Sequence, residues 1–213
     1  MKVIVYTCNL GGYDVLRKAP KPIEDFRYLY YTDQEAPDGW EKMTMKSGGR
    51  RESRFYKINS HLLPEHDISI YVDANAYWGR SPFKMVEYIK GFDIAMPPHP
   101  NDRCVYKHAL TCMRLNLDAI LPILKQVGKY ANDGMPENIG LTENGLIIRA
   151  NNPKVKELNE LWWKEYQAGS HRDQLSMPYA LWTTQPKLKI LPFSARENKW
   201  FSNNLIHLKS RHE

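Results

Sequence analysis

The sequence predicts an α/β domain built around a mainly parallel sheet. Short β-rich runs alternate with helical segments through the first half of the chain, the pattern typical of strand–helix–strand units. Polar side chains follow the ends of several of these runs. At 213 residues, without a linker or an internal repeat, the chain is the size of one domain with a substantial core. We therefore expect a single domain over residues 1–213.

The first half of the chain provides five of the expected strands. Apolar, β-branched and aromatic residues predict them over Val3–Thr7, Phe26–Thr32, Trp40–Met45, Ile68–Val72 and Phe92–Met96. Two helices are expected between them. One covers Arg50–Leu63 and is stopped by Pro64, and the other begins at Ser81-Pro82, a cap followed by a first-turn proline, and ends at Gly91.

The second half is expected to be mostly helical. The segment from Val105 to about Tyr130 has helical periodicity, and Pro122 should break or kink it. The remaining expected elements are helices over Lys154–Gln167 and Asp173–Trp182, strands over Leu146–Arg149 and Leu188–Leu191, and a polar tail to Glu213.

Charge and composition indicate the kind of partner and the cellular compartment, but they do not indicate the activity. The net charge of +6 favours anionic partners such as nucleotides, nucleic acid or acidic glycans. Cys8, Cys104 and Cys112 form no CxxC pair and no zinc spacing, so we read them as reduced thiols of a cytoplasmic protein. The N-terminus does not have the pattern of a signal peptide, and no run approaches the roughly 20 apolar residues of a membrane span.

Polar residues after the expected strands should lie together, because ligands of such sheets bind at the carboxyl ends of the strands. Asn9, Asp33, Asp73 and Pro97–His99 all follow a predicted strand. The glycine pair Gly11-Gly12 either lets the backbone approach a ligand or forms a simple turn.

Asp73 and Asn75 are the main metal candidates. Both follow the buried strand Ile68–Val72, and alternation along a strand would point both side chains the same way. Two oxygen-bearing side chains suit a hard divalent cation that carries a phosphate, Mn²⁺ or Mg²⁺. The alternative is a turn that Asp73 initiates.

A cationic helix precedes this segment. Arg50, Arg54, Lys57 and His61 share one helical face, beside an apolar stripe that consists of Phe55, Ile58 and Leu62. This face is either solvated or binds an anion. A divalent cation and several cations together would neutralise a diphosphate.

Several other polar residues have two interpretations each. Asp33 could accept hydrogen bonds from a nucleobase or ribose, or cap a turn. Asp173 could act as a general base at a helix start, or complement the helix dipole after a Ser170 cap. His207 in the tail could complete a metal shell, and so, with less support, could His212; both could equally be solvated, and His99 is ambiguous in the same way.

Several segments together resemble one known family. They are Tyr31-Thr-Asp-Gln-Glu35, Arg51-x-x-Arg-x-x-Lys57 with His61, Tyr71-Val-Asp-Ala-Asn75, His99-Pro-x-x-Arg103, Gly140-Leu-Thr-Glu143, Arg149, Trp162-Trp163 and Ser170-His-Arg-Asp-Gln-Leu-Ser-x-Pro-Tyr179. Their order and spacing, from Val3 to Trp182, are similar to the glycosyltransferase-like family formerly known as domain of unknown function 616. It includes plant mucilage-related and pollen-turgor-related proteins and short bacterial and phage members.

The resemblance implies a GT-A nucleotide-diphospho-sugar transferase fold with a Rossmann-like nucleotide-binding half. Asp73 and Asn75 would then occupy the Asp-x-Asp position, with Asn replacing the usual second Asp. The remaining roles follow residue by residue. Arg51, Arg54 and Lys57 would meet the diphosphate, Asp33 would lie near the base, Glu143, Asp173 and Gln174 would face the sugar and acceptor, and Thr7, Asn9 and Arg172 are further donor-binding candidates.

The leading hypothesis is a metal-assisted glycosyltransferase that moves a sugar from a nucleotide-diphospho-sugar to a hydroxyl acceptor. The acceptor could be a glycan, a lipid-linked sugar or a modified DNA base, and Asp173 is the candidate base if the configuration inverts. The alternatives are a metal-dependent phosphohydrolase or nuclease, which usually needs more clustered carboxylates, and a nucleotide-sugar-binding module without catalysis.

Overall fold

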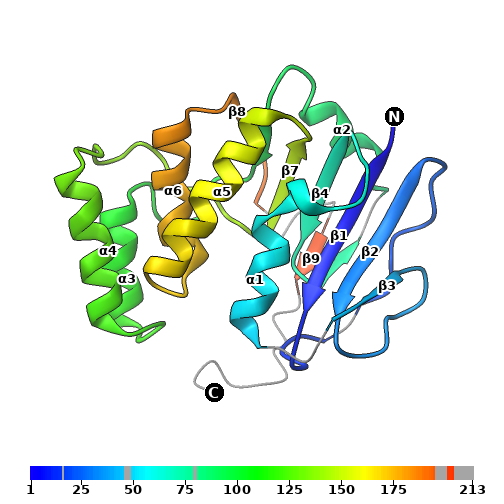
Figure 1. The fold of residues 1–213 in the computed structure, drawn as a ribbon, viewed down its shortest axis with the longest axis horizontal. Coiled ribbons are helices and arrows are strands. Elements are labelled where there is room, and N and C mark those ends of the chain that lie inside the picture. The colour runs from blue at the N-terminus through cyan, green and yellow to red at the C-terminus, as the bar shows by residue number, and fades with distance from the viewer. Residues whose placement is uncertain (16, 46–48, 79–80, 195–200, 204–213) are drawn as a thin grey trace.

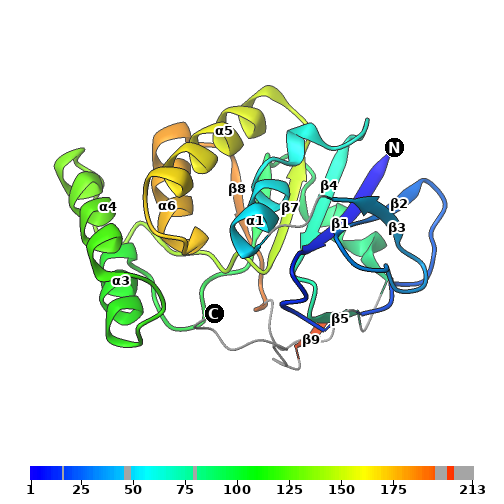
Figure 2. The same cartoon turned by 60° about the horizontal axis from the view of Figure 1, so that its bottom comes forward.

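A seven-stranded sheet forms the centre of the protein, and helices cover both of its faces (Figure 1). The computed structural model describes residues 1–15, 17–45, 49–78, 81–194 and 201–203. The strands of the sheet are β1 (Val3–Asn9), β2 (Phe26–Thr32), β3 (Glu41–Thr44), β4 (Ile68–Val72), β6 (Ile94–Met96), β7 (Leu146–Ala150) and β8 (Leu188–Ile190). A second, two-stranded ribbon pairs β5 (Ala76–Trp78) with β9 (Phe201–Asn203), as Figure 2 shows.

Helices and short 3₁₀ turns complete the described fold. The α-helices are α1 (Arg50–Ile58), α2 (Met85–Tyr88), α3 (Val105–Arg114), α4 (Ile120–Asn132), α5 (Pro153–Ala168) and α6 (Asp173–Thr184), and the 3₁₀ helices are η1 (Ser60–Leu62) and η2 (Pro82–Lys84). In both views α3 and α4 form a pair at the end of the molecule away from β2 and β3 (Figures 1 and 2).

The strand order confirms the expected mainly parallel sheet. The order is β3-β2-β1-β4-β7-β6-β8, and β7 alone runs against its neighbours β4 and β6. The chain builds outward from β1 through β2 to β3 and then returns to place β4 on the other side of β1. The order therefore reverses between β1 and β4, where ligands of open α/β sheets usually bind.

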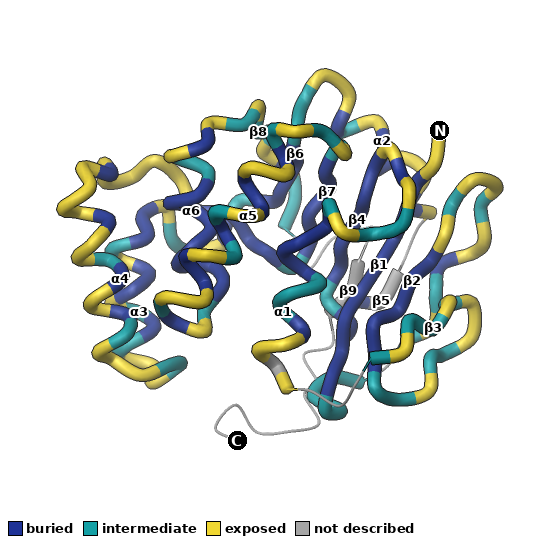
Figure 3. The backbone as a smooth tube through the Cα atoms, viewed as in Figure 1, coloured by how far each residue is buried: buried dark blue, intermediate teal, exposed yellow. Residues whose placement is uncertain are grey.

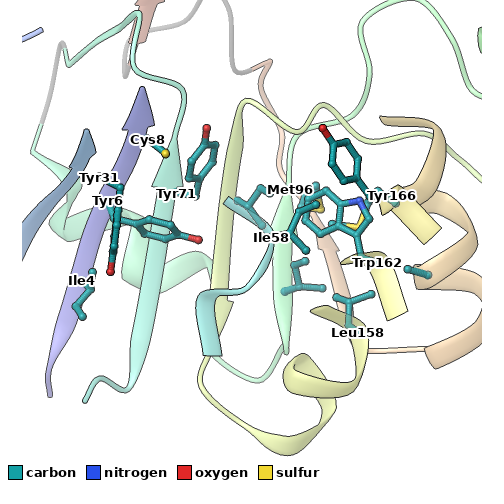
Figure 4. Close-up of a cluster of buried hydrophobic side chains, with 14 of the residues drawn as sticks. Ile4, Tyr6, Cys8, Tyr31, Ile58, Tyr71, Met96, Leu158, Trp162 and Tyr166 are labelled. Carbon is teal, nitrogen blue, oxygen red and sulfur yellow. The ribbon is translucent and has the colours of Figure 1, made fainter. Parts of the chain in front are cut away.

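Side chains alternate between two cores, one on each face of the sheet. On β1, Val3 and Val5 pack with the buried residues of α2, whereas Ile4 and Tyr6 face the core that α1, α5 and α6 complete. Figure 4 shows part of this second core, with Trp162 and Tyr166 of α5 on its helix side and Ile4 and Tyr6 of β1 on its sheet side. The strands β1, β2, β4, β6 and β7 are buried along most of their length, whereas the edge strands β3 and β8 are not, and exposed residues concentrate on the outer helix faces and loops (Figure 3).

The first helix is shorter than the sequence indicates. We expected a helix to Leu63, but α1 ends at Ile58, and Asn59 leaves the helical region with φ −90° and ψ 56°. The Asn59 side-chain amide donates to the Phe55 carbonyl, which caps the end of α1. Because the chain then turns into η1, Leu62 is 61% exposed and does not continue the apolar stripe.

The break in the next helical segment also lies elsewhere than expected. Pro122 is in the first turn of α4, where a missing backbone N–H has no intrahelical partner to lose. The helix stops instead after Arg114, because Asn116 adopts a left-handed conformation with φ 49° and Leu117 N bonds back to the Cys112 carbonyl.

Arg149 joins the sheet to two helices from the buried interior. This β7 residue is 0% exposed, and its guanidinium donates to the carbonyls of Lys57 (2.7 Å) and Ile58 (2.8 Å), to Asn159 Oδ1 (3.0 Å) and to the Tyr6 hydroxyl. The two carbonyls belong to the last turn of α1, where the helix dipole is negative and backbone acceptors lack helical partners. Arg149 therefore fixes the end of α1 against the sheet.

Replacing Arg149 with methionine should destabilise the protein by about 3 kcal/mol or more, because several buried acceptors would lose their donor. Denaturant unfolding followed by circular dichroism measures this. Arg27→Met is the matched control: Arg27 pairs with Glu41 at the exposed sheet edge, so its loss should cost under about 1 kcal/mol. Equal costs for the two variants would contradict the structural role of Arg149.

Candidate active site

A cavity of about 560 Å³ opens at the carboxyl ends of β1 and β4, at the point where the strand order reverses. Its walls come from the residues after β1 and β4, from α1 and α3, from the start of α6, and from the turn that precedes β7. Because β7 is antiparallel, its beginning lies at the same edge as the ends of its neighbours. This arrangement brings together polar residues that are far apart in the sequence.

Asp73 and Asn75 both line this cavity, although not for the reason that strand alternation suggested. Strand β4 ends at Val72, and residues 73–76 form a turn in which Ala76 N donates to the Asp73 carbonyl. Asn75 is 5% exposed, and its amide nitrogen lies 3.5 Å from Asp14 Oδ1. Within the described part of the chain, Asn75 Oδ1 is buried without a hydrogen-bond partner. An acceptor left open in this way suits a ligand in the cavity.

Lys57 lies between two carboxylates at the base of the cavity. Its ammonium is 2.8 Å from Asp173 Oδ2 and 3.4 Å from Asp73 Oδ1, and the side chain is 3% exposed. Arg54, one turn earlier on α1, has its Nε 3.8 Å from Asp173 Oδ1. Two cations of the expected face of α1 thus form ion pairs with Asp73, after β4, and with Asp173, the first residue of α6.

Burial and pairing fix the protonation of this cluster. Burial alone would raise the pKa of Asp173, but Lys57 and Arg54 outweigh it and hold that pKa well below the usual range of a carboxyl. Burial raises the pKa of the Tyr71 phenol well above its ordinary value. The Tyr71 hydroxyl therefore stays protonated and donates to Asp73 Oδ1 at 2.9 Å. Asp173 is thus held as an anion beside the two cations Lys57 and Arg54.

The model of the TOD1/MUCI70, glycosyltransferase-like domain matches residues 42–207, well over half of the chain. The chain belongs to this family. The matched segment includes α1, the Asp73–Asn75 turn and the start of α6, the elements that hold the charged cluster. The α/β fold with a mostly parallel sheet is consistent with a GT-A-like transferase, and family membership implies a nucleotide-sugar donor.

A search of curated proteins gave no match to the chain. Among the described residues, no helix is both long and apolar enough to cross a membrane.

Several donor-binding residues expected from the family resemblance lie outside the cavity lining. Arg51 is exposed on α1 and donates to the Gln167 carbonyl of α5 at 3.3 Å. Thr7 is buried within β1. Both oxygens of Asp33 accept from the backbone N–H of Gly11, at 3.2 and 3.0 Å, so this carboxylate anchors the glycine loop that follows β1.

Asn9 and the residues expected to face the sugar do line the cavity. Asn9 closes its own loop, because its side chain bonds both the N–H and the carbonyl of Asp14. Glu143, in the turn before β7, accepts from the Ser194 hydroxyl at 3.0 Å. Asp173 and Gln174, which were expected to face the sugar, also line the cavity from the start of α6. Arg172, a donor-binding candidate, lies beside them.

Ser170 does not cap α6 as expected. The N-cap of the helix is Arg172, which makes no side-chain capping bond, and the Ser170 hydroxyl instead donates to Asp118 Oδ2 at 2.6 Å. His207, the third expected metal ligand, and His212 lie outside the described residues.

Sequence reasoning gave no site role to several residues that line the cavity, among them Tyr71, Asp14 and His108. Tyr71 belongs to the expected strand and to the quoted family motif, and its place two residues before Asp73 was a usable signal. His108 lies on α3 with no sequence motif around it, so only the packing of α3 against α6 reveals its position.

Replacing Asp173 with asparagine should destabilise the protein at pH 7 by about 3 kcal/mol, because Lys57 and Arg54 would be left buried without this anion. The pKa of Asp173 is lowered by folding, so its contribution is fully present above about pH 4, the unfolded value, and is lost as pH falls through the folded pKa. The difference in unfolding free energy between wild type and Asp173→Asn should therefore shrink as pH falls below 4.

Unfolding curves measured across this pH range test that prediction. Asp38→Asn provides the control, because Asp38 pairs with Lys18 at the exposed surface, where such pairs contribute little. A gap between wild type and Asp173→Asn that stays constant down to pH 2 would refute a charged Asp173 in the folded protein.

Proposed function

We propose that this protein transfers a sugar from a nucleotide-diphospho-sugar to a hydroxyl acceptor. The observation that supports this best is the position of two cations at the reversal point of the sheet: Lys57 beside Asp73 and Asp173, and Arg54 beside Asp173. Cations at that edge suit the diphosphate of a donor, and the family assignment supports a donor of this class.

The cations are held in place before any ligand arrives. Lys57 and Arg54 have side chains that are only 3% and 16% exposed, and both pair with Asp173. Arg172 lines the same cavity from the start of α6. A departing diphosphate would meet positive charge that needs little rearrangement, which is how preorganised sites stabilise developing negative charge.

The Asp73–Asn75 turn fits a divalent cation, Mn²⁺ or Mg²⁺. The open Oδ1 of Asn75 and the Asp73 carboxylate, which keeps 36% side-chain exposure, are oxygen ligands of the kind that hard cations prefer. Such an ion would supply further charge neutralisation for the diphosphate. Because Asn75 is neutral, Asp73 would be the anionic ligand of the ion. His207 is the candidate third ligand.

Among the acceptor-side residues, we assign Asp173 to positioning rather than proton transfer. A carboxylate whose pKa is lowered by two neighbouring cations is a weak base. We propose that Asp173 fixes Lys57 and Arg54, and that Glu143 and Gln174 contact the transferred sugar or the acceptor hydroxyl.

The acceptor is a glycan, a lipid-linked sugar or a modified DNA base in this proposal. The net charge of +6 is compatible with all three. The salt dependence of acceptor binding distinguishes DNA from a neutral glycan. Contacts to DNA phosphates would make acceptor binding weaken steeply as salt rises, whereas a neutral glycan would bind independently of salt.

Asp73→Asn should reduce sugar transfer and donor hydrolysis by about 100-fold or more and remove the manganese-dependent part of donor binding. A panel of nucleotide-sugars, each with and without Mn²⁺, identifies the donor by thermal stabilisation; a ligand at 100 times its Kd adds about 2.7 kcal/mol. Transfer is then assayed with that donor.

Asp67→Asn is the matched control, because Asp67 precedes β4 as Asp73 follows it, and it lies outside the cavity lining. Full activity of Asp73→Asn would contradict the proposed site. Cleavage of a phosphoester without any sugar nucleotide would favour a phosphohydrolase or nuclease, and donor binding without turnover would favour a binding module.

A further inference from the structure

A second group of metal-binding side chains lies in the same cavity, on the wall formed by α3. His99 follows β6 in a proline-rich turn, Asp102 lies in the loop before α3, and His108 is in the first turns of that helix. Each offers one ligand atom, and these atoms lie within 4.8 Å of one another. The histidine side chains are 6% and 5% exposed and that of Asp102 is 19% exposed.

Hydrogen bonds hold the three side chains close to one another. His108 Nδ1 lies 2.7 Å from Asp102 Oδ2, and because a carboxylate only accepts, this nitrogen carries the proton. Asp102 N donates to His99 Nδ1 at 2.9 Å, so that nitrogen presents a lone pair, 3.9 Å from Asp102 Oδ2. The two imidazole rings pack edge to face with centroids 4.7 Å apart. The donor atoms therefore converge without needing an ion to gather them.

We propose that His99, Asp102 and His108 form a binding site for a borderline divalent cation such as Zn²⁺ or Co²⁺. Two imidazole nitrogens and one carboxylate oxygen are softer as a set than the oxygen ligands of Asp73 and Asn75. Binding would replace the hydrogen bonds at the facing nitrogens, and the His108 ring proton would shift to Nε2, which keeps the ring neutral.

Three protein ligands leave coordination positions open, and these would face a cavity that already contains Lys57 and Asp73. An oxygen of a substrate in that cavity could occupy such a position. The inference goes beyond the proposed function and does not depend on it, because binding of the ion alone can be measured.

The test is a titration of the metal-free full chain with Co²⁺ and Zn²⁺, in the absence of any sugar nucleotide. Isothermal calorimetry gives affinity and stoichiometry, and the Co²⁺ absorption spectrum reports nitrogen ligation. We expect one ion per chain. His99→Gln, His108→Gln and Asp102→Asn should each weaken its binding by about 10-fold or more. Asp73→Asn should leave it unchanged, which separates this site from the donor site.

His66→Gln is the control for the loss of a buried histidine, because His66 is 5% exposed and lies outside the cavity lining. The affinity of the His66→Gln variant for Co²⁺ and Zn²⁺ should equal that of wild type. Thermal unfolding without metal checks that each variant is folded.

Two results would overturn the proposal. Absence of Co²⁺ and Zn²⁺ binding to wild type would mean that the Asp102–His108 hydrogen bond serves only to hold the start of α3. Binding that survives in His108→Gln but is lost in Asp73→Asn would assign the ion to the Asp73–Asn75 turn instead.

Discussion

The guanidinium of Arg149 is the contact on which the geometry of the site depends. It lies near the end of the buried β7 strand and donates to the last carbonyls of α1, to the β1 residue Tyr6 and to the α5 residue Asn159. Lys57 contributes its backbone to this contact and its side chain to the cavity. A single buried donor group therefore sets both the packing of α1 and the direction in which its cations point.

Ion pairs connect the cations of α1 to the other walls of the cavity. Lys57 connects the end of β4 to the start of α6 through Asp73 and Asp173, and Arg54 reinforces the α6 side. Buried ion pairs are costly to desolvate and usually contribute little net stability. Their presence at the reversal point of the sheet is better explained by preorganised charge for an anionic ligand, because such charge is only useful if it is held fixed.

Local sequence patterns predicted the elements well and the contacts between them poorly. Phe26–Thr32 and Ile68–Val72 were predicted with the bounds that the structure shows, because short runs rich in apolar, β-branched and aromatic residues indicate buried strands. The end of α1 was misplaced because Asn59 provides its own cap, which apolar periodicity does not register. Helical spacing placed Arg54 but not Arg51 on the cationic face, whereas the family resemblance grouped the two. The position of α5 shows that Arg51 reaches a backbone carbonyl outside the cavity.

The sequence by itself determined the α/β class, the strand that ends just before Asp73, and a cationic helix that precedes this strand, because each depends on neighbouring residues and on the intrinsic periods of strands and helices. The tertiary structure alone decided that Asp173 pairs with Lys57 and that His99, Asp102 and His108 share a wall of the same cavity. Those contacts depend on strand order and helix packing, which place distant segments side by side and leave no local signature in the chain.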